Sequence, residues 1–139
     1  MFVLDLSVEK WVGNQDEGDF IENPTWQQIE SAIGELNGTS KTLVTLGADE
    51  EIYMSVGGGA GGQYIVNVTF DNLTFYNLVD LSQLEEVQQL VVGGQLGNYQ
   101  AKICVDLQTA LLAAKTFALA GELEESVSWE VDESLVEVG

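Results

Sequence analysis

The sequence of 139 residues contains no histidine and no arginine, and it has only four lysines, one cysteine and one proline. Histidine is the commonest general base and a frequent metal ligand, so catalysis by Ser-His-Asp or Cys-His groups and zinc sites of the Cys/His type are excluded. Arginine is the side chain best suited to bidentate recognition of phosphate or carboxylate groups. These absences exclude more classes of enzyme than any motif in the chain suggests.

Positive charge is scarce while negative charge is abundant. The chain has 23 Asp and Glu residues, which gives a formal net charge of -19. Its lysines are too scattered along the sequence to form a basic patch: Lys10, Lys41, Lys102 and Lys115. Because 45% of the residues are hydrophobic, the chain is a folded domain and not a disordered acidic tail. An anionic surface repels nucleic acid and anionic membranes, so we expect neither as a direct partner and predict a basic protein instead.

The length predicts a single domain spanning residues 1–139. The first residues lack the basic and apolar regions of a secretory signal, and no apolar run approaches the roughly 20 residues of a membrane-spanning helix. Cys104 cannot form an internal disulfide, and its neighbours Ile103 and Val105 predict a buried, unreactive thiol. We therefore expect a cytoplasmic protein that is a monomer or a weak homodimer.

In the first third of the chain, apolar residues alternate over 2–8, which predicts a strand. The polar, glycine-punctuated stretch 13–22 predicts a loop. Asn23 as the N-cap and Pro24 in the first turn predict the start of a helix, and Asn37-Gly38 its end. Between them an apolar stripe runs at spacings of three and four: Trp26, Ile29, Ile33 and Leu36.

Strand patterns dominate the middle of the chain. We predict strands at 42–46, 52–56, 63–70, 73–79 and 87–92, with glycine-rich connections at 57–62 and at Gly93-Gly94. The short connections favour antiparallel pairing, because parallel neighbours need crossovers of a dozen residues or more.

The last third predicts a short edge strand at 99–105 and a helix that begins at Asp106 and ends before Gly121. The inner face of this helix is expected to carry Leu107, Leu111, Ala114, Phe117 and Ala118. Alternation at Val127, Trp129 and Val131 predicts a last strand, followed by a frayed acidic tail at 132–139. The fold class is therefore α+β: an antiparallel sheet of about five to seven strands with two helices packed on one face.

Two features invite a catalytic or cofactor role. Clusters of acids could serve glycoside hydrolysis or bind Ca²⁺, but they lack the EF-hand spacing, and adjacent acids in turns are usually solvated. The glycine-rich run 57–62 lacks the Lys and Ser/Thr of a phosphate-binding loop and precedes a strand. We therefore expect a protein that is not an enzyme and that has no cofactor, no metal site and no catalytic residues.

An ordered set of short motifs resembles the Imm1 family of bacterial immunity proteins, which accompany toxins of polymorphic toxin and contact-dependent inhibition systems. The motifs are Asn23-Pro24-Thr25-Trp26, Leu36-Asn37-Gly38, the strand Thr42-Leu43 to Leu46, Gly57-Gly58-Gly59 before Tyr64-Ile65-Val66, Val92-Gly93-Gly94-Gln95, Val105-Asp106-Leu107 with Ala113-Ala114 and Phe117, Gly121-Glu122-Leu123, and Ser128-Trp129-Glu130. They span about residues 23–130. The chain has Lys102 where the family often has an arginine. The resemblance implies an α+β fold, a non-catalytic protein and a cognate toxin, often a nucleic-acid deaminase.

The charge and the resemblance lead to one hypothesis: an immunity protein occludes the basic active site of a toxin, a deaminase or a nuclease, by imitating the charge of its substrate. The residues expected to bind this partner lie in an acidic turn, in an acidic loop and at one further tyrosine: Asp49, Glu50, Glu51 and Tyr53; Asp16, Glu17 and Asp19; and Tyr76. The alternative is an acidic, non-catalytic ligand-binding or adaptor domain whose charge aids solubility. An enzyme that uses paired carboxylates is the third possibility.

Overall fold

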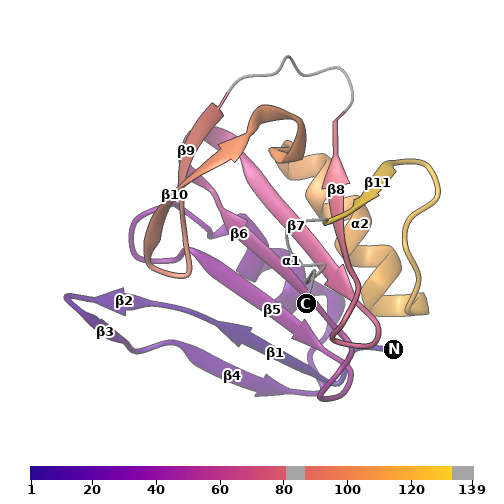
Figure 1. Cartoon of the computed structure of the whole chain (residues 1–139). Coiled ribbons are helices and arrows are strands. Elements are labelled where there is room, and N and C mark those ends of the chain that lie inside the picture. Colours follow the sequence, from indigo (N-terminus) through magenta and orange to yellow (C-terminus); the bar gives the residue numbers. More distant parts are fainter. Residues whose placement is uncertain (81–86, 133–139) are drawn as a thin grey trace.

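A computed structural model describes residues 1–80 and 87–132 of the chain (Figure 1). The strands are β1 (Asp5–Val8), β2 (Trp11–Val12), β3 (Gln15–Asp16), β4 (Asp19–Glu22), β5 (Leu43–Gly47), β6 (Tyr53–Gly58), β7 (Tyr64–Thr69), β8 (Phe75–Val79), β9 (Val87–Val92), β10 (Gln95–Gln100) and β11 (Ser128–Val131). The helices are α1 (Trp26–Gly34) and α2 (Leu107–Ala120), with short 3-10 turns η1 (Ala60–Gly62) and η2 (Ala101–Ile103). Beyond Asp132, the predicted acidic tail lies outside the described residues.

The central element is a seven-stranded sheet in the order β11-β8-β7-β6-β5-β1-β4. Every neighbouring pair in it is antiparallel. The predicted α+β class and antiparallel sheet are confirmed. The last strand, β11, pairs with β8 after the chain has passed through α2, so one edge of the sheet depends on a contact between distant segments.

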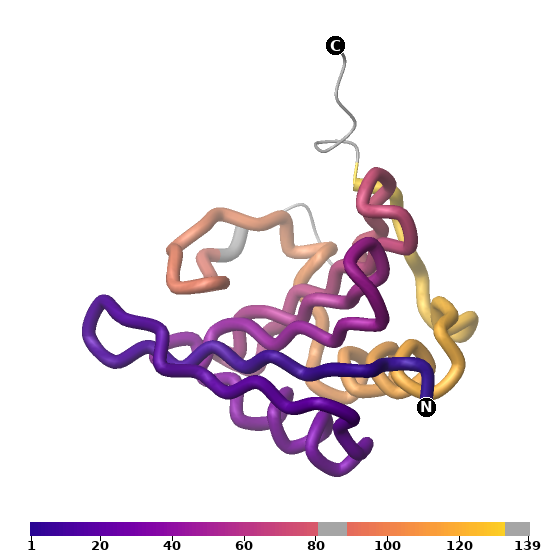
Figure 2. The backbone as a smooth tube through the Cα atoms, turned by 90° about the horizontal axis from the view of Figure 1, so that it is seen from below, coloured from indigo at the N-terminus to yellow at the C-terminus, as the bar shows by residue number. Residues whose placement is uncertain are grey.

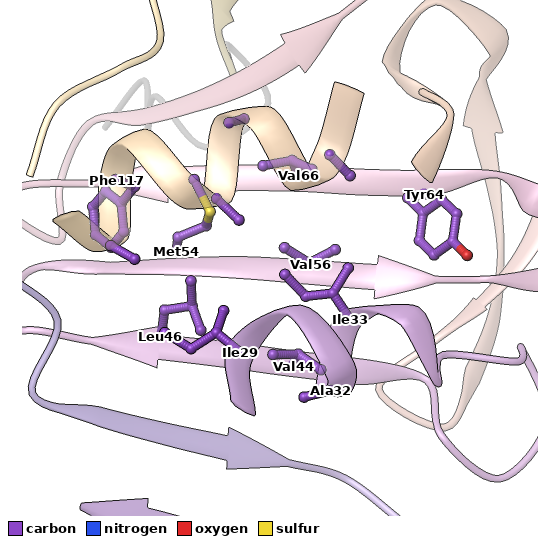
Figure 3. Packing of buried hydrophobic residues seen from close by; sticks show 14 of the residues in the cluster. Ile29, Ala32, Ile33, Val44, Leu46, Met54, Val56, Tyr64, Val66 and Phe117 are labelled. Atoms are coloured by element: carbon purple, nitrogen blue, oxygen red, sulfur yellow. The ribbon is translucent and has the colours of Figure 1, made fainter. Parts of the chain in front are cut away.

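Both helices cover the same face of the sheet, as Figure 2 shows from below. The strands contribute alternate apolar residues to this face, and α1 and α2 pack on them (Figure 3). The fully buried side chains include Leu6, Ile29, Ile33, Val44, Leu46, Met54, Val56, Val66, Val68, Leu78 and Phe117. At the centre of α2 the buried residues are small: Ala110, Ala113 and Ala114. Their small side chains allow the helix to approach the sheet closely.

The start of α1 differs from the prediction. Its N-cap is Thr25 and not Asn23, because Thr25 and Gln28 form a capping box in which each side chain binds the backbone of the other residue. Asn23 instead takes a positive φ of 52° in the turn before the helix. The helix also ends earlier than predicted, at Gly34, although Leu36 remains buried. In α2 the predicted boundaries are confirmed: Asp106 is the N-cap and Gly121 the left-handed C-cap.

The N-terminal region contains more strand than predicted in one place and less in another. The stretch 13–22, expected to be a loop, holds β3 and the edge strand β4, which pairs with β1. The acidic sequence of β4 does not show the apolar alternation that predicts a strand. Its backbone nevertheless pairs with β1, because such pairing does not need an apolar pattern. β1 itself begins only at Asp5, because the amides of Phe2 and Val3 donate to the carbonyl of Ala118 in α2.

A hairpin of β9 and β10 folds over the sheet face opposite the helices (Figure 2). Its Val92 side chain lies against Gly57, where a Cβ atom would come within 2.5 Å of a methyl carbon of Val92. The predicted edge strand at 99–105 is wrong, because β10 ends at Gln100 and η2 follows. Leu90, Ile65 and Cys104 form a small second core under the hairpin. Cys104 is buried there as predicted, and burial raises the pKa of its thiol.

The tip of this hairpin is fixed to the N-terminal strands. Gly93 and Gly94 have φ values of 62° and 77°, so they form the predicted tight turn. The amide of Gly94 donates to the hydroxyl of Thr42 at 2.9 Å, and the ring of Trp11 lies against the Gly94 backbone. The indole of Trp11 donates in turn to Glu9 at 3.0 Å. These contacts attach the hairpin to β5 and to the segment that follows β1.

Candidate functional site

The sheet face that the helices leave uncovered carries a row of small polar side chains across five neighbouring strands. In register order these are Ser7, Thr45, Ser55, Asn67 and Asn77, which we call the open face. All five are half-buried by their neighbours. At one end of the row Phe20 of β4 is 62% exposed, and at the other end lies Glu130 of β11. The open face therefore offers hydroxyl and amide groups at its centre, where the centre of the opposite face is apolar.

Acids gather where the strands of the open face meet the turns on one side. The β5–β6 turn carries Asp49, Glu50 and Glu51, while Asp5 and Glu22 are cross-strand partners beside it. Tyr53 joins this group, because its hydroxyl donates to Asn72 of the β7–β8 turn at 3.0 Å. We call this set, with Asp71, the acidic turn end: Asp5, Glu22, Asp49, Glu50, Glu51 and Asp71. It contains three of the residues that the sequence analysis proposed as partner-binding, and a fourth, Tyr53, lies beside it.

Within the acidic turn end, aspartates and glutamates have different roles. One carboxylate oxygen of Asp49 accepts from the amides of Glu51 and Ile52 at 2.7 and 3.1 Å. Asp71 holds its turn in the same way, and hydrogen bonds from the amides of Thr74 and Leu73 lower the pKa of its carboxyl group. Glu50 and Glu51 are exposed. Asp49 and Asp71 thus fix the turns, while Glu50 and Glu51 present charge to solvent.

The predicted acidic loop lies at the opposite end of β1, about 7 Å along the strand from Ser7. Asp16 accepts from the amides of Lys10 and Gly18, each at 2.9 Å, so it also fixes a turn. Together with Glu9, Ser7, Phe20 and Thr45 it lines a hollow of about 330 Å³ that continues onto the open face. Asp19 pairs with Val8 and borders both this hollow and a second one beneath α1, whereas Glu17 is exposed.

The eight predicted site residues therefore do not form one continuous patch. Measured along the strands, the turn acids lie on one side of the row of polar residues and the loop acids on the other. Ser7, Thr45 and Ser55 lie between the two groups. Tyr76 is separate from both groups. Its ring contacts Phe70 at 6.4 Å on the side of the sheet covered by α2, so it is part of the packing there. Sequence reasoning missed the open face itself, although the alternation of small polar residues in the strands was a signal for it.

A groove of about 1020 Å³ lies on the same side of the sheet as the open face, towards β11. It runs between the strands β7, β8 and β11 and the segment from β10 to η2. Its polar lining consists mainly of amides: Asn67, Asn77, Asn98 and Gln100. Lys102 and Glu130 form an ion pair across it, with nitrogen and oxygen 3.0 Å apart.

Within residues 1–80 and 87–132, no group of three or more Cys, Asp or Glu side chains has an arrangement that could hold a metal ion. None of the helices in that part has the length and apolarity needed to cross a membrane.

An α+β domain whose sheet is covered by helices on one face only has the other face available for contact with a partner. The family model described as immunity protein Imm1 matches residues 17–131. The chain therefore belongs to the Imm1 family of immunity proteins. Membership implies a cognate toxin as the binding partner and argues for a non-catalytic protein. No curated protein and no solved structure matches the chain.

Proposed function

We propose that this protein neutralises a toxin that acts on nucleic acid by placing the acidic turn end and the open face over the toxin's basic active site. The carrying observation is the arrangement of charge: six acids of the acidic turn end surround one border of a face whose centre is neutral and polar. An enzyme that acts on DNA or RNA needs a basic substrate groove. The acidic surface would imitate the charge of the phosphate backbone in that groove.

The shape of the open face supports this proposal. From Asp5 to Glu9, one residue past the end of β1, the chain extends by four residue steps, about 13 Å, and from β4 to β6 the sheet spans about 15 Å. Acids border this area at both ends, and Phe20 and Tyr53 add aromatic area for contact. Small hydroxyl side chains between them let a partner approach the sheet closely. Loop acids and turn acids can thus contact one partner although they do not contact each other.

The number of charges also supports fast association. Complementary charge raises association rates above the value for neutral surfaces, to 10⁸–10⁹ M⁻¹s⁻¹ at low salt in favourable cases. Rapid capture benefits a protein that must inactivate a lethal enzyme in the cell that produces it. A net charge of -19 with two ion pairs among the described residues leaves most acids available to attract a basic partner.

The test uses the purified toxin encoded beside this protein and a variant with Glu50→Gln and Glu51→Gln. Asp49 stays unchanged, because its carboxylate holds the turn. We expect the association rate constant to fall by about three- to tenfold at low salt and to depend less on salt, since both charges face the partner. Stopped-flow fluorescence at several salt concentrations measures both effects.

The matched control removes two exposed charges elsewhere, with Glu30→Gln on α1 and Glu125→Gln between α2 and β11. Net charge falls equally in both variants, so a smaller change in the control locates the effect at the acidic turn end. Equal rate constants for the two variants would contradict the proposed surface. In parallel, the toxin should lose its activity on DNA or RNA at one equivalent of this protein. A complex that retains full activity would contradict occlusion of the active site.

A further inference from the structure

We propose that the amide-lined groove decides which toxin the protein accepts, by binding an extended, uncharged segment of that toxin. This inference rests on the proposed function and assigns a second, different role to another part of the same surface. The acidic turn end attracts the toxin by its charge, and the groove binds the cognate toxin more tightly than other basic proteins.

Charge by itself discriminates poorly in this protein. A net charge of -19 attracts any basic protein, including toxins for which other immunity proteins exist. Specificity is a difference between affinities, and it needs groups that lose more with the wrong partner than with the right one. Directional hydrogen bonds do this, because a donor or acceptor that is buried and left unpaired in the wrong complex destabilises that complex. The site of discrimination should therefore be rich in hydrogen-bonding groups that carry no charge.

The groove has this chemistry. The side-chain amide of Asn67 donates to the carbonyl oxygen of Asn77 at 2.9 Å, which fixes both side chains on the floor. Within the described residues, the carbonyl oxygen of Asn67 and the amino group of Asn77 have no further hydrogen-bond partner. The same holds for the amides of Asn98 and Gln100 on the wall. Each such amide can both donate and accept, which matches the alternating groups of an extended backbone.

The groove has little net charge compared with the acidic turn end: its lining includes one lysine, Lys102, and two acids, Glu130 and Asp132. Lys102 pairs with Glu130 at 3.0 Å, so the cation of η2 is neutralised by the strand on the other wall. This pair joins η2 to β11 across the groove. The remaining acid of the lining, Asp132, follows the end of β11, while the side chains of Asn67, Asn77, Asn98 and Gln100 are uncharged amides. An uncharged segment is therefore favoured over a basic one at this place.

The groove is large enough for a segment of chain. Sites for small ligands are clefts of about 300–1,000 Å³ that enclose most of the ligand. The groove has about 1020 Å³, at the upper end of this range, and is partly open to solvent. Its aromatic residues Phe75 and Tyr99 face this space and can pack on the apolar parts of a peptide. It lies on the same side of the sheet as the open face, so one toxin can contact both regions.

The experiment compares binding kinetics for three variants with the purified toxin encoded beside this protein. In the groove variant, Asn98→Ala and Gln100→Ala remove two exposed amides of β10. We expect its dissociation rate constant to rise by at least about tenfold, while the association rate constant and its salt dependence stay unchanged. The variant with Glu50→Gln and Glu51→Gln should show the opposite pattern. The control variant, Gln27→Ala with Gln95→Ala, removes two exposed amides outside the groove and should match the unchanged protein.

The outcomes separate this inference from the proposed function. If the unchanged protein binds and inhibits the toxin but the groove variant dissociates at the same rate, the inference is overturned and the proposed function stands. A groove variant that loses association rate only, or that loses a self-association seen by sedimentation in the unchanged protein, also overturns it. Absence of any binding to the toxin contradicts the proposed function first. Thermal unfolding of all variants confirms that they are folded before their rates are compared.

Discussion

The two faces of the central sheet are made by the same strands and have opposite characters. In β6 and β7, Val56, Val66 and Val68 are fully buried under the helices. Their sequence neighbours Ser55 and Asn67 lie on the open face. A strand turns successive side chains to opposite sides, so one stretch of sequence encodes both surfaces. The comparison teaches that stability and recognition are separated here by one residue step.

Packing differs between the faces in the same way. Under the helices, Phe117 contacts Phe2 and Phe70 with ring centroids 5.6 and 6.1 Å apart. On the open face, the contacts are polar and short, such as the bond between Asn67 and Asn77. The hairpin β9–β10 covers part of the open face, and its approach depends on the absence of a side chain at Gly57. Substitutions on the two faces should therefore have very different costs.

The largest effect is expected under the helices. Phe117→Ala should lower the free energy of unfolding by about 3–5 kcal/mol, because it removes a fully buried aromatic ring and leaves a cavity. Urea unfolding followed by tryptophan fluorescence measures this change. Ser7→Ala on the open face is the control and should stay within about 0.5 kcal/mol of the unchanged protein. Similar costs at the two positions would mean that the open face also carries the fold.

A medium effect is expected where the hairpin meets the sheet. Gly57→Ala places a Cβ atom in the space of the Val92 methyl groups, so it should cost about 1–3 kcal/mol and loosen the hairpin. Ser55→Ala, two residues earlier on the same face, is the matched control. Hydrogen exchange of the amides in 95–100 should speed up in the Gly57 variant only. Unchanged exchange would show that Val92 moves aside without loss of docking.

The smallest effect concerns an acid on the helix-covered side. Hydrogen bonds from Ser126 and from the hydroxyl of Thr116 lower the pKa of Glu124 to about 2. A lowered folded-state pKa stabilises the fold above the ordinary carboxyl pKa of 4.5, and this contribution is lost as the pH falls towards about 2. Thr116→Val should raise the pKa of Glu124, as read from carboxyl carbon shifts in NMR. Thr74→Val, in the β7–β8 turn, is the control and should leave the pKa of Glu124 unchanged.

Much of the fold could be predicted because local physics decides it. The alternation in β5 to β8, the turn at Gly93-Gly94 and the ends of α2 at Asp106 and Gly121 all follow from nearby residues. The start of α1 was misplaced because two capping signals compete, and the capping box at Thr25 satisfies two backbone groups where Asn23 would satisfy one. The sequence analysis missed β4 because its acidic sequence lacks an apolar alternation. The strand is formed by backbone pairing with β1 instead.

The candidate site was less predictable. Composition alone indicated a basic partner, and the acidic turn at Asp49, Glu50 and Glu51 was identified from its sequence. That Asp49 fixes this turn while Glu50 and Glu51 present charge follows from hydrogen bonds that only the structure shows. Likewise, tyrosine is a residue type that is common in binding sites, yet the position of Tyr76 in the sheet directs its ring towards Phe70.

The sequence by itself determined the class of fold, the anionic character and the lack of histidine chemistry, because these depend on composition and on periods of two or three to four residues. Only the tertiary structure decided the rest. It joined β11 to β8, folded the hairpin over the open face and thereby formed the amide-lined groove from segments far apart in the chain. Such contacts depend on complementary surfaces and on close approach at positions such as Gly57, and these have no local signal.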